Sequence, residues 1–141
     1  MSAAPRRLPR TLLTYGRFDL FHQEHIGFLR KLSTLGTELI VGCTTDALAE
    51  ASGCPCDMPF AARRAVLENC RFVSRVIAEN DPAQKRTDIV NYNVSTLAMG
   101  AEHRGALDDL SDIAQVLYVP RTSSRPTLRY VQNSGVRLAV G

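Results

Sequence analysis

The feature that most limits how this chain can fold is a short apolar run that ends at a glycine and is followed by an amphipathic helical stretch. Residues 12–15 are mostly apolar, Gly16 ends the run, and an apolar stripe at helical spacing begins near His25. This order predicts a strand, a tight glycine turn and a helix whose first backbone N–H groups can bind a phosphate. His22 lies three residues before His25, so one helical turn places both imidazoles on the same side of that helix start.

Short apolar runs and helical segments alternate along the rest of the chain. Strands are predicted at residues 11–15, 38–43, 72–78, 95–99 and 115–119, and helices at residues 25–35, 59–70, 83–92 and 126–132. One further helical turn is predicted at residues 46–51, and residues 101–114 are predicted to be partly helical. Strands that alternate with helices form a parallel sheet with right-handed crossovers. We therefore expect an α/β layer fold.

Several polar or glycine residues directly follow the predicted strands. Gly16, Asp46, Gly100 and Arg121 each lie at or just after a strand end. In parallel sheets, ligands bind at the carboxyl ends of the strands, at the point where the strand order reverses. The sequence therefore predicts a polar site at one rim of the sheet.

The composition fits one globular domain. The 141 residues are enough for a single core, and 45% are hydrophobic while 22% are charged. Residues 1–10 contain two prolines and three arginines and are predicted to be a flexible tail, with residues 11–141 as a single domain. A net charge of +3 is too small to indicate a nucleic-acid partner, although it suits a small anionic ligand.

The sequence also predicts where the protein resides and the state of its thiols. Residues 2–10 lack the apolar segment of a secretory signal, and no apolar run reaches membrane-spanning length. We expect a cytoplasmic protein without a membrane span, with its four cysteines as free thiols. Cys54 and Cys56 could belong to a metal site, but zinc sites need two such pairs or added histidines. A loop with two thiols is favoured, and no metal site is predicted.

The segment from Thr14 to His25 resembles the H-x-G-H motif of the nucleotidyltransferase superfamily, above all the glycerol-3-phosphate cytidylyltransferase family. Further segments occur in the order of that family: residues 44–46, 63–68, 99–100 and 121–122. The resemblance covers roughly residues 10 to 130. It implies a Rossmann-like three-layer sandwich with a five-stranded parallel sheet, of the nucleotidyltransferase type.

The resemblance also implies a reaction. A cytidylyltransferase of this family would transfer CMP from CTP to a small phosphorylated alcohol such as glycerol 3-phosphate and release pyrophosphate. Such a transfer depends on in-line positioning and on stabilising phosphate charge, which glycines, helix N-termini, imidazoles and guanidiniums provide. Mg²⁺ is expected to arrive bound to the triphosphate, with few or no protein ligands. The family further implies a homodimer.

Three groups of site residues follow from the family motifs. The catalytic group consists of His22, His25 and Arg121. The nucleotide-binding group consists of Tyr15, Gly16, Arg17, Phe18, Gly100, Thr122 and Thr127. Arg63 and Arg71 are assigned to phosphates of the acceptor or the triphosphate. From the residue types alone, the histidines could instead cap or pack the helix start, and the arginines could be solvated surface groups.

Five positions depart from the family pattern. Glu24 stands where the family has glycine, and Ala101 replaces an aspartate. Ser52 and Cys54 fall where the family has two lysines that meet phosphates. Pro126 replaces a serine in the segment that holds the β- and γ-phosphates. Glu24, Ala101 and the missing loop lysines motivate an alternative, a non-catalytic module that binds a nucleotide or another protein on the same scaffold.

Arg17 is a further difference, because the cytidylyltransferases usually carry a small hydroxyl residue at this position. The sequence Gly16-Arg17-Phe18 is similar to related adenylyltransferases of the superfamily. An arginine here could bind a phosphate with its planar fork of N–H donors. This similarity motivates a second alternative, an adenylyltransferase that uses ATP.

Overall fold

The computed structural model describes residues 10–121 of the chain. The predicted tail at residues 1–9 and the predicted helix at residues 126–132 lie outside this range. Thr122, Thr127 and Pro126 lie outside it as well.

The core of the molecule is a five-stranded parallel sheet in the order β3-β2-β1-β4-β5. The strands are β1 (Thr11–Gly16), β2 (Glu38–Thr44), β3 (Arg75–Glu79), β4 (Thr96–Gly100) and β5 (Gln115–Val119). The first strand lies at the centre, where it pairs with β2 along its whole length and with β4 through Leu12 and Leu13. The predicted α/β fold with a parallel sheet is therefore confirmed.

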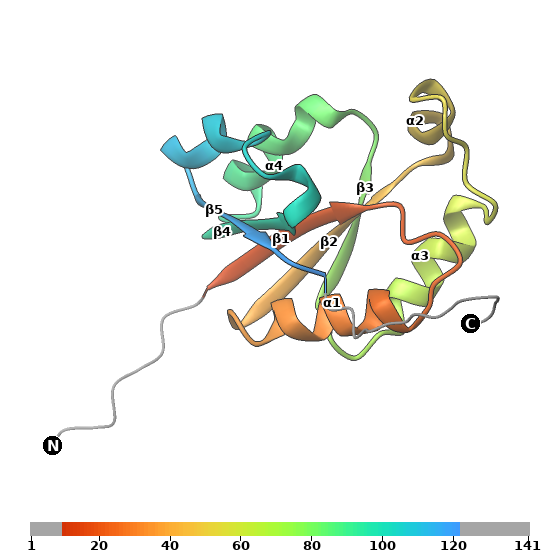
Figure 1. The fold of residues 1–141 in the computed structure, drawn as a ribbon, viewed down its shortest axis with the longest axis horizontal. Coiled ribbons are helices and arrows are strands. Elements are labelled where there is room, and N and C mark those ends of the chain that lie inside the picture. The colour runs from red at the N-terminus through yellow and green to blue at the C-terminus, as the bar shows by residue number, and fades with distance from the viewer. Residues whose placement is uncertain (1–9, 122–141) are drawn as a thin grey trace, which may run out of the picture.

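Helices cover both faces of the sheet and give three layers (Figure 1). They are α1 (Gln23–Ser33), α2 (Asp46–Ala51), α3 (Phe60–Glu68) and α4 (Lys85–Asn91), with short 3-10 turns at Pro82–Gln84, Ala101–His103 and Asp108–Asp112. Successive strand residues point to opposite faces. Accordingly, Leu12 packs against Phe28 of α1 and Leu67 of α3, while Leu13 packs with Ile89 of α4. No helix within residues 10–121 is long and apolar enough to cross a membrane.

The third strand and its neighbours differ from the prediction at their ends. The strand was predicted to begin at Phe72 but begins at Arg75, because residues 70–73 form a turn in which the Val73 N–H donates to the Cys70 carbonyl. Phe72 and Val73 still pack against the core, so their apolar character reflects burial rather than strand pairing. The helix predicted from Ala83 begins instead with a 3-10 turn at Pro82, capped by Asp81.

The strand order reverses at the centre of the sheet. From β1 the chain passes through α1 to β2 on one side, and from β3 it passes through α4, on the opposite face, to β4 on the other side. The carboxyl ends of β1 and β4 therefore lie next to each other while their following segments diverge, which opens a crevice between them. Gly16 and Gly100 end these two strands, as expected for a polar site at this rim.

Candidate active site

A cavity of about 550 Å³ lies at the carboxyl ends of the strands. Six of the residues predicted from sequence line it together: Tyr15, Gly16, Arg17, Phe18, His25 and Arg121. Further lining residues come from the ends of β2 and β3 and from α4, among them Thr44, Glu79 and Lys85. The cavity therefore gathers side chains from segments far apart in the sequence.

The turn after β1 has a strained backbone that packs tightly on itself. Phe18 and Leu20 adopt φ angles of 51° and 49°, which residues with side chains seldom occupy. The ring of buried Phe18 folds under the glycine, and a Cβ at Gly16 would lie only 2.8 Å from its Cε2 atom. Strain of this kind persists only where surrounding contacts hold it, and it often occurs at functional sites.

The two histidines cap the start of α1 with their own rings. The backbone N–H of Glu24 donates to His22 Nδ1 at 3.2 Å, and the N–H of His22 donates to His25 Nδ1 at 3.1 Å. Because each Nδ1 accepts a hydrogen bond, we assign the neutral tautomer with hydrogen on Nε2 to both rings. The rings lie 4.2 Å apart between centroids, so two N–H donors are available together at a helix N-terminus.

His25 is held in an aromatic environment that keeps it uncharged. Its ring stacks on Phe21 at 5.3 Å and meets the edge of Phe18 at 5.5 Å. Burial, together with the neighbouring His22 and Arg121, lowers the pKa of His25 to about 4. At neutral pH this imidazole can therefore donate a hydrogen bond to an anion without itself becoming charged.

Glu24, the departure inside the histidine motif, does not line the cavity. The residue is exposed in the first turn of α1, and its backbone N–H serves the cap on His22. A carboxylate at this end of a helix complements the helix dipole. The side chain therefore leaves the cavity open.

Arg121 lies at the other side of the cavity and is paired with an acidic residue. Its Nε and Nη2 atoms lie 3.1 and 3.0 Å from Glu102 Oε2, and its guanidinium lies 4.6 Å from the centroid of the Phe28 ring. Burial raises the pKa of Glu102, but the hydrogen bond and charge of Arg121, a backbone hydrogen bond and the nearby His103 together lower the pKa overall. The Glu102 carboxylate lies directly against Gly100, where a Cβ atom would collide with it. Gly100 therefore makes room for this pair instead of lining the cavity.

A polar network at the β2 and β3 ends was not predicted from the sequence. The Tyr15 hydroxyl donates to Asp88 Oδ2 at 2.6 Å, and burial together with this carboxylate raises the pKa of Tyr15. Lys85 Nζ lies 3.1 Å from Glu79 Oε2 and 4.7 Å from the centre of the Tyr15 ring, while Thr44 Oγ1 donates to Glu79 Oε1 at 2.9 Å. The available signal was position, because Glu79 is the last residue of β3 and Lys85 is the first residue of α4.

Arg63 is buried and is not placed to bind a substrate phosphate. Its side chain is only 1% exposed, and it donates to the carbonyls of Met58, Arg17 and Thr44 at 2.7 to 3.0 Å. It also pairs with Asp46 Oδ1 at 2.8 Å. The expectation that it binds a substrate phosphate is therefore corrected, because its donors already bind the loops that follow β1 and β2.

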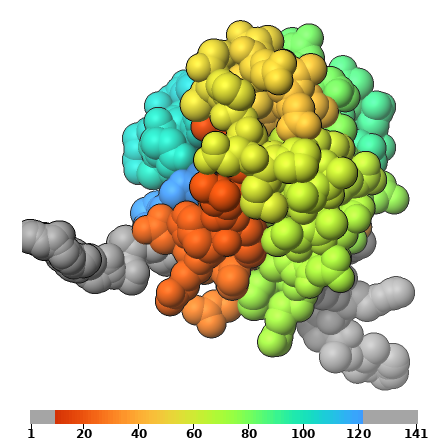
Figure 2. Space-filling view, turned by 90° about the vertical axis from the view of Figure 1, so that its right-hand side faces the viewer, coloured from red at the N-terminus to blue at the C-terminus, as the bar shows by residue number. Residues whose placement is uncertain are grey.

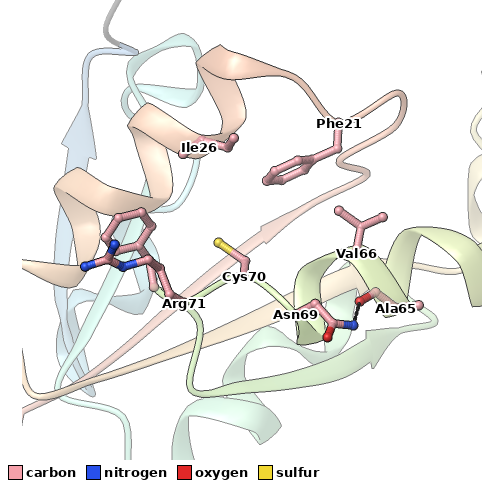
Figure 3. Close-up of a pocket in the computed structure, with 8 residues that line it drawn as sticks. Phe21, Ile26, Ala65, Val66, Asn69, Cys70 and Arg71 are labelled. Carbon is pink, nitrogen blue, oxygen red and sulfur yellow. Dashed lines mark hydrogen bonds between the residues drawn. The ribbon is translucent and has the colours of Figure 1, made fainter.

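Arg71 also lies apart from the cavity. It borders a second, largely apolar pocket of about 570 Å³ between α1 and α3, where Phe21 and Ile26 face Val66 and Cys70 (Figure 3). Its guanidinium stacks 5.3 Å from the centre of the adjacent Phe72 ring. Figure 2 shows this face of the molecule, with α1 and α3 side by side. The structure thus does not bring Arg71 to the site that holds the histidines.

All cysteine, histidine and acidic residues of the chain lie within residues 10–121. All four cysteines, Cys43, Cys54, Cys56 and Cys70, are free. Burial raises the pKa of Cys43 to about 11. Within residues 10–121, no group of three or more histidine, cysteine or acidic side chains has an arrangement that could hold a metal ion.

His22 does not line the cavity. It is exposed, and its ring lies 4.2 Å between centroids from that of His25, which does line the cavity. His25, Arg17 and Arg121 thus line one cavity, with His22 beside His25 at the start of α1. Donors and cations gathered at a helix N-terminus are suited to binding and stabilising phosphate groups.

Known proteins with similar sequences identify the family of this chain, and a similar structure supports its fold. The family of cytidylyltransferase-like proteins matches residues 13–132. The glycerol-3-phosphate cytidylyltransferase of Bacillus subtilis (strain 168) is 34% identical over 120 residues, which cover 85% of this chain and 93% of the relative. The enzyme of the same name from Staphylococcus aureus (strain NCTC 8325 / PS 47) is 32% identical over 123 residues, covering 87% and 93%.

A solved structure supports the fold. The lipopolysaccharide core biosynthesis protein from Thermoplasma volcanium GSS1 aligns with a TM-score of 0.70 at 19% identity, covering 82% of this chain and 99% of that one. At this identity the likeness concerns the fold alone. The family match, by contrast, covers most of the chain, and the relatives named above match over nearly their whole length. The chain therefore belongs to the cytidylyltransferase-like family.

Proposed function

We propose that the protein is a CTP-dependent cytidylyltransferase that transfers CMP to a small phosphorylated alcohol, with glycerol 3-phosphate as the first candidate. The observation that carries this proposal is the self-capped histidine pair at the start of α1, of which His25 lines the same cavity as Arg121. The names of the relatives supply the nucleotide and the acceptor class.

In the proposed reaction, an oxygen of the acceptor phosphate attacks the α-phosphorus of CTP. A new P–O bond forms, the bond from the α-phosphorus to the bridging oxygen breaks, and pyrophosphate leaves with that electron pair. The attacking phosphate is already an anion, so the reaction requires no general base. The Nε2–H groups of His22 and His25 would donate to the phosphates, and Arg121 would stabilise their charge.

Mg²⁺ is proposed to enter with the triphosphate, where it would neutralise charge on the leaving pyrophosphate. Within residues 10–121, the cavity carboxylates already have partners: Asp19 accepts two backbone N–H groups, Glu79 pairs with Lys85, and Glu102 pairs with Arg121. This donor set suits an ion whose ligands are triphosphate oxygens and water, because Mg²⁺ usually keeps few protein ligands.

Two further statements are proposals that rest on the family resemblance and the sequence. The protein is proposed to form a homodimer, and it is proposed to act in the cytoplasm. Light scattering after size-exclusion chromatography measures the mass of the assembly directly, and a mass near 15.5 kDa would exclude the dimer.

The proposed function is tested by the stability of the purified protein with Mg²⁺ and CTP, ATP, GTP or UTP in parallel. A ligand that binds only the folded state, at a hundred times its dissociation constant, adds about 2.7 kcal/mol to the free energy of unfolding. We expect CTP to raise the unfolding midpoint and the others to have little effect. Pyrophosphate release with CTP and glycerol 3-phosphate then tests the transfer itself.

The other outcomes of this test are equally specific. A raised midpoint with ATP alone would identify an adenylyltransferase, the alternative suggested by Gly16-Arg17-Phe18. No change with any of the four nucleotides would contradict the enzymatic proposal and favour a non-catalytic module.

A further inference from the structure

The cations of the cavity differ in whether a carboxylate already neutralises them. Lys85 lies 3.1 Å from Glu79, and Arg121 lies 3.0 Å from Glu102. Arg17 is exposed, and its only side-chain hydrogen-bond partner within residues 10–121 is a sulfur, Cys54 Sγ, at 3.1 Å from Nη2. A thiol is a weak acceptor and carries no formal charge. Arg17 can therefore bind an anion without breaking an ion pair.

The base of the Arg17 side chain is fixed although its end is exposed. The Arg17 carbonyl accepts a hydrogen bond from Arg63 Nη1 at 3.0 Å, and Arg63 also anchors the Thr44 carbonyl at 2.7 Å. The next residue, Phe18, is buried. The turn thus holds the Cα of Arg17 in place while the exposed guanidinium extends to Cys54. A fixed base lowers the entropy lost when the fork binds a phosphate.

The position of Arg17 distinguishes between the two substrates. Its guanidinium contacts Cys54, which lies in the loop after β2 and α2, whereas Arg121 follows β5. In the strand order β3-β2-β1-β4-β5, the segment of Cys54, which Arg17 contacts, and the segment of Arg121 follow strands on opposite sides of β1. In-line transfer requires the attacking and leaving oxygens to lie on opposite sides of the reacting phosphorus. If Arg121 holds the phosphates that leave, the acceptor approaches from the side of Arg17.

We propose that Arg17 binds the phosphate of the acceptor, so that the cation for this substrate lies in the glycine turn instead of the following loop. This inference rests on the proposed function and names the acceptor subsite within it. The guanidinium ends beside residue 54, one of the two loop positions at which the family resemblance places a lysine. The chain would then place a positive charge beside residue 54 from the glycine turn instead of from the loop itself.

The experiment compares the wild-type protein with Arg17→Gln, which removes the charge but keeps a polar side chain. Dissociation constants for glycerol 3-phosphate and for CTP with Mg²⁺ are measured by calorimetry, and KM values for both by pyrophosphate release. Losing a charged hydrogen bond should weaken glycerol 3-phosphate binding on the order of 10- to 100-fold. The dissociation constant for CTP should change by less than about threefold, since no triphosphate contact is lost.

Two further variants sharpen the comparison. Arg64→Gln removes an exposed arginine on α3 that pairs with Glu68, and it should leave both dissociation constants unchanged. The double variant Arg17→Gln/Cys54→Lys returns a cation to the loop and should recover most of the lost affinity for glycerol 3-phosphate. Unfolding midpoints of all variants show whether each retains its fold.

The outcomes separate the inference from the proposed function. Unchanged glycerol 3-phosphate binding in Arg17→Gln, or a loss confined to CTP, would overturn the assignment of Arg17. A wild-type protein that binds CTP but neither glycerol 3-phosphate nor inorganic phosphate would overturn this subsite while leaving the nucleotide specificity intact. A wild-type protein that binds no nucleotide and no phosphate would overturn the proposed function, and the inference with it.

Discussion

At the scale of single residues, the histidine pair caps α1 and also carries the chemical role that we propose for it. His25 Nδ1 accepts the His22 backbone N–H and thereby completes a capping box, while its Nε2 atom remains available as a donor. A glutamine at the same helix position can accept the same hydrogen bond, because glutamine and glutamate are the usual residues there. Substitutions at His25 can therefore separate the two tasks.

We expect His25→Gln and His25→Ala to lower kcat for pyrophosphate release by a similar factor, roughly 100- to 1,000-fold, because both remove the imidazole donor. Only His25→Ala should also lose about 1 kcal/mol of stability, since it alone removes the cap. Steady-state kinetics and urea unfolding of both variants provide the test. A near-normal kcat in His25→Gln would show that the ring serves only to cap α1.

At the scale of elements, the site depends on two loops that are joined by one buried arginine. Arg63, on α3, donates to carbonyls in the loops after β1 and β2 and to Asp46 at the start of α2. The backbone N–H of Phe60, at the start of α3, also donates to Asp46. This hydrogen bond is the main cause that lowers the pKa of the Asp46 carboxyl, and the hydrogen bond from Arg63 is the second. The turn that carries Arg17 is therefore positioned by a helix remote in sequence.

Arg63→Met should destabilise the protein by about 3 kcal/mol or more, because it leaves buried carbonyls without donors. Arg64→Met, its neighbour on α3, removes an exposed pair with Glu68 and should cost less than about 0.5 kcal/mol. Urea unfolding of the two variants gives the comparison. Normal stability of Arg63→Met together with selective loss of phosphate binding would restore the role that its sequence position suggested.

At the scale of the whole molecule, several groups give stability the same dependence on pH. The pKa of His25 is lowered from 6.5 to about 4, so the unfolded chain takes up a proton between these values and the folded protein does not. Hydrogen bonds from backbone N–H groups and arginines hold the pKa values of Asp19, Asp46 and Asp112 below 3.8. In both cases the unfolded state binds more protons as pH falls.

The free energy of unfolding should therefore change little from pH 6.5 to about 8, fall between pH 6.5 and 4 through His25, and fall further below pH 4 through the aspartates. In His25→Gln the loss between pH 6.5 and 4 should be smaller, while the loss below pH 4 should remain. Urea midpoints measured across this range test both parts. An unaltered pH profile in His25→Gln would assign the upper transition to another group.

Local patterns in the sequence determined much of this protein. The alternation of apolar runs and amphipathic helices specifies the parallel sheet, because strand and helix periodicity are properties of neighbouring residues. The glycine turn and the three-residue spacing of His22 and His25 likewise locate the end of α1 at which we propose phosphate binding, since one helical turn fixes their relation. The strand boundary at Arg75 was less predictable, because a partly buried turn residue such as Phe72 gives the same apolar pattern in the sequence as a strand residue.

Only the tertiary structure decided which polar side chains serve the cavity. Arg63 donates hydrogen bonds to carbonyls up to 46 positions away in the sequence, and the Tyr15 hydroxyl donates to Asp88, which lies 73 positions away. Arg17 meets Cys54 across 37 positions, which places a cation beside the loop from which the expected lysines are missing. Such partners come together only when the crossovers bring the strand ends to one rim. Residue spacing cannot reveal these partners, because each hydrogen bond depends on how the whole chain packs.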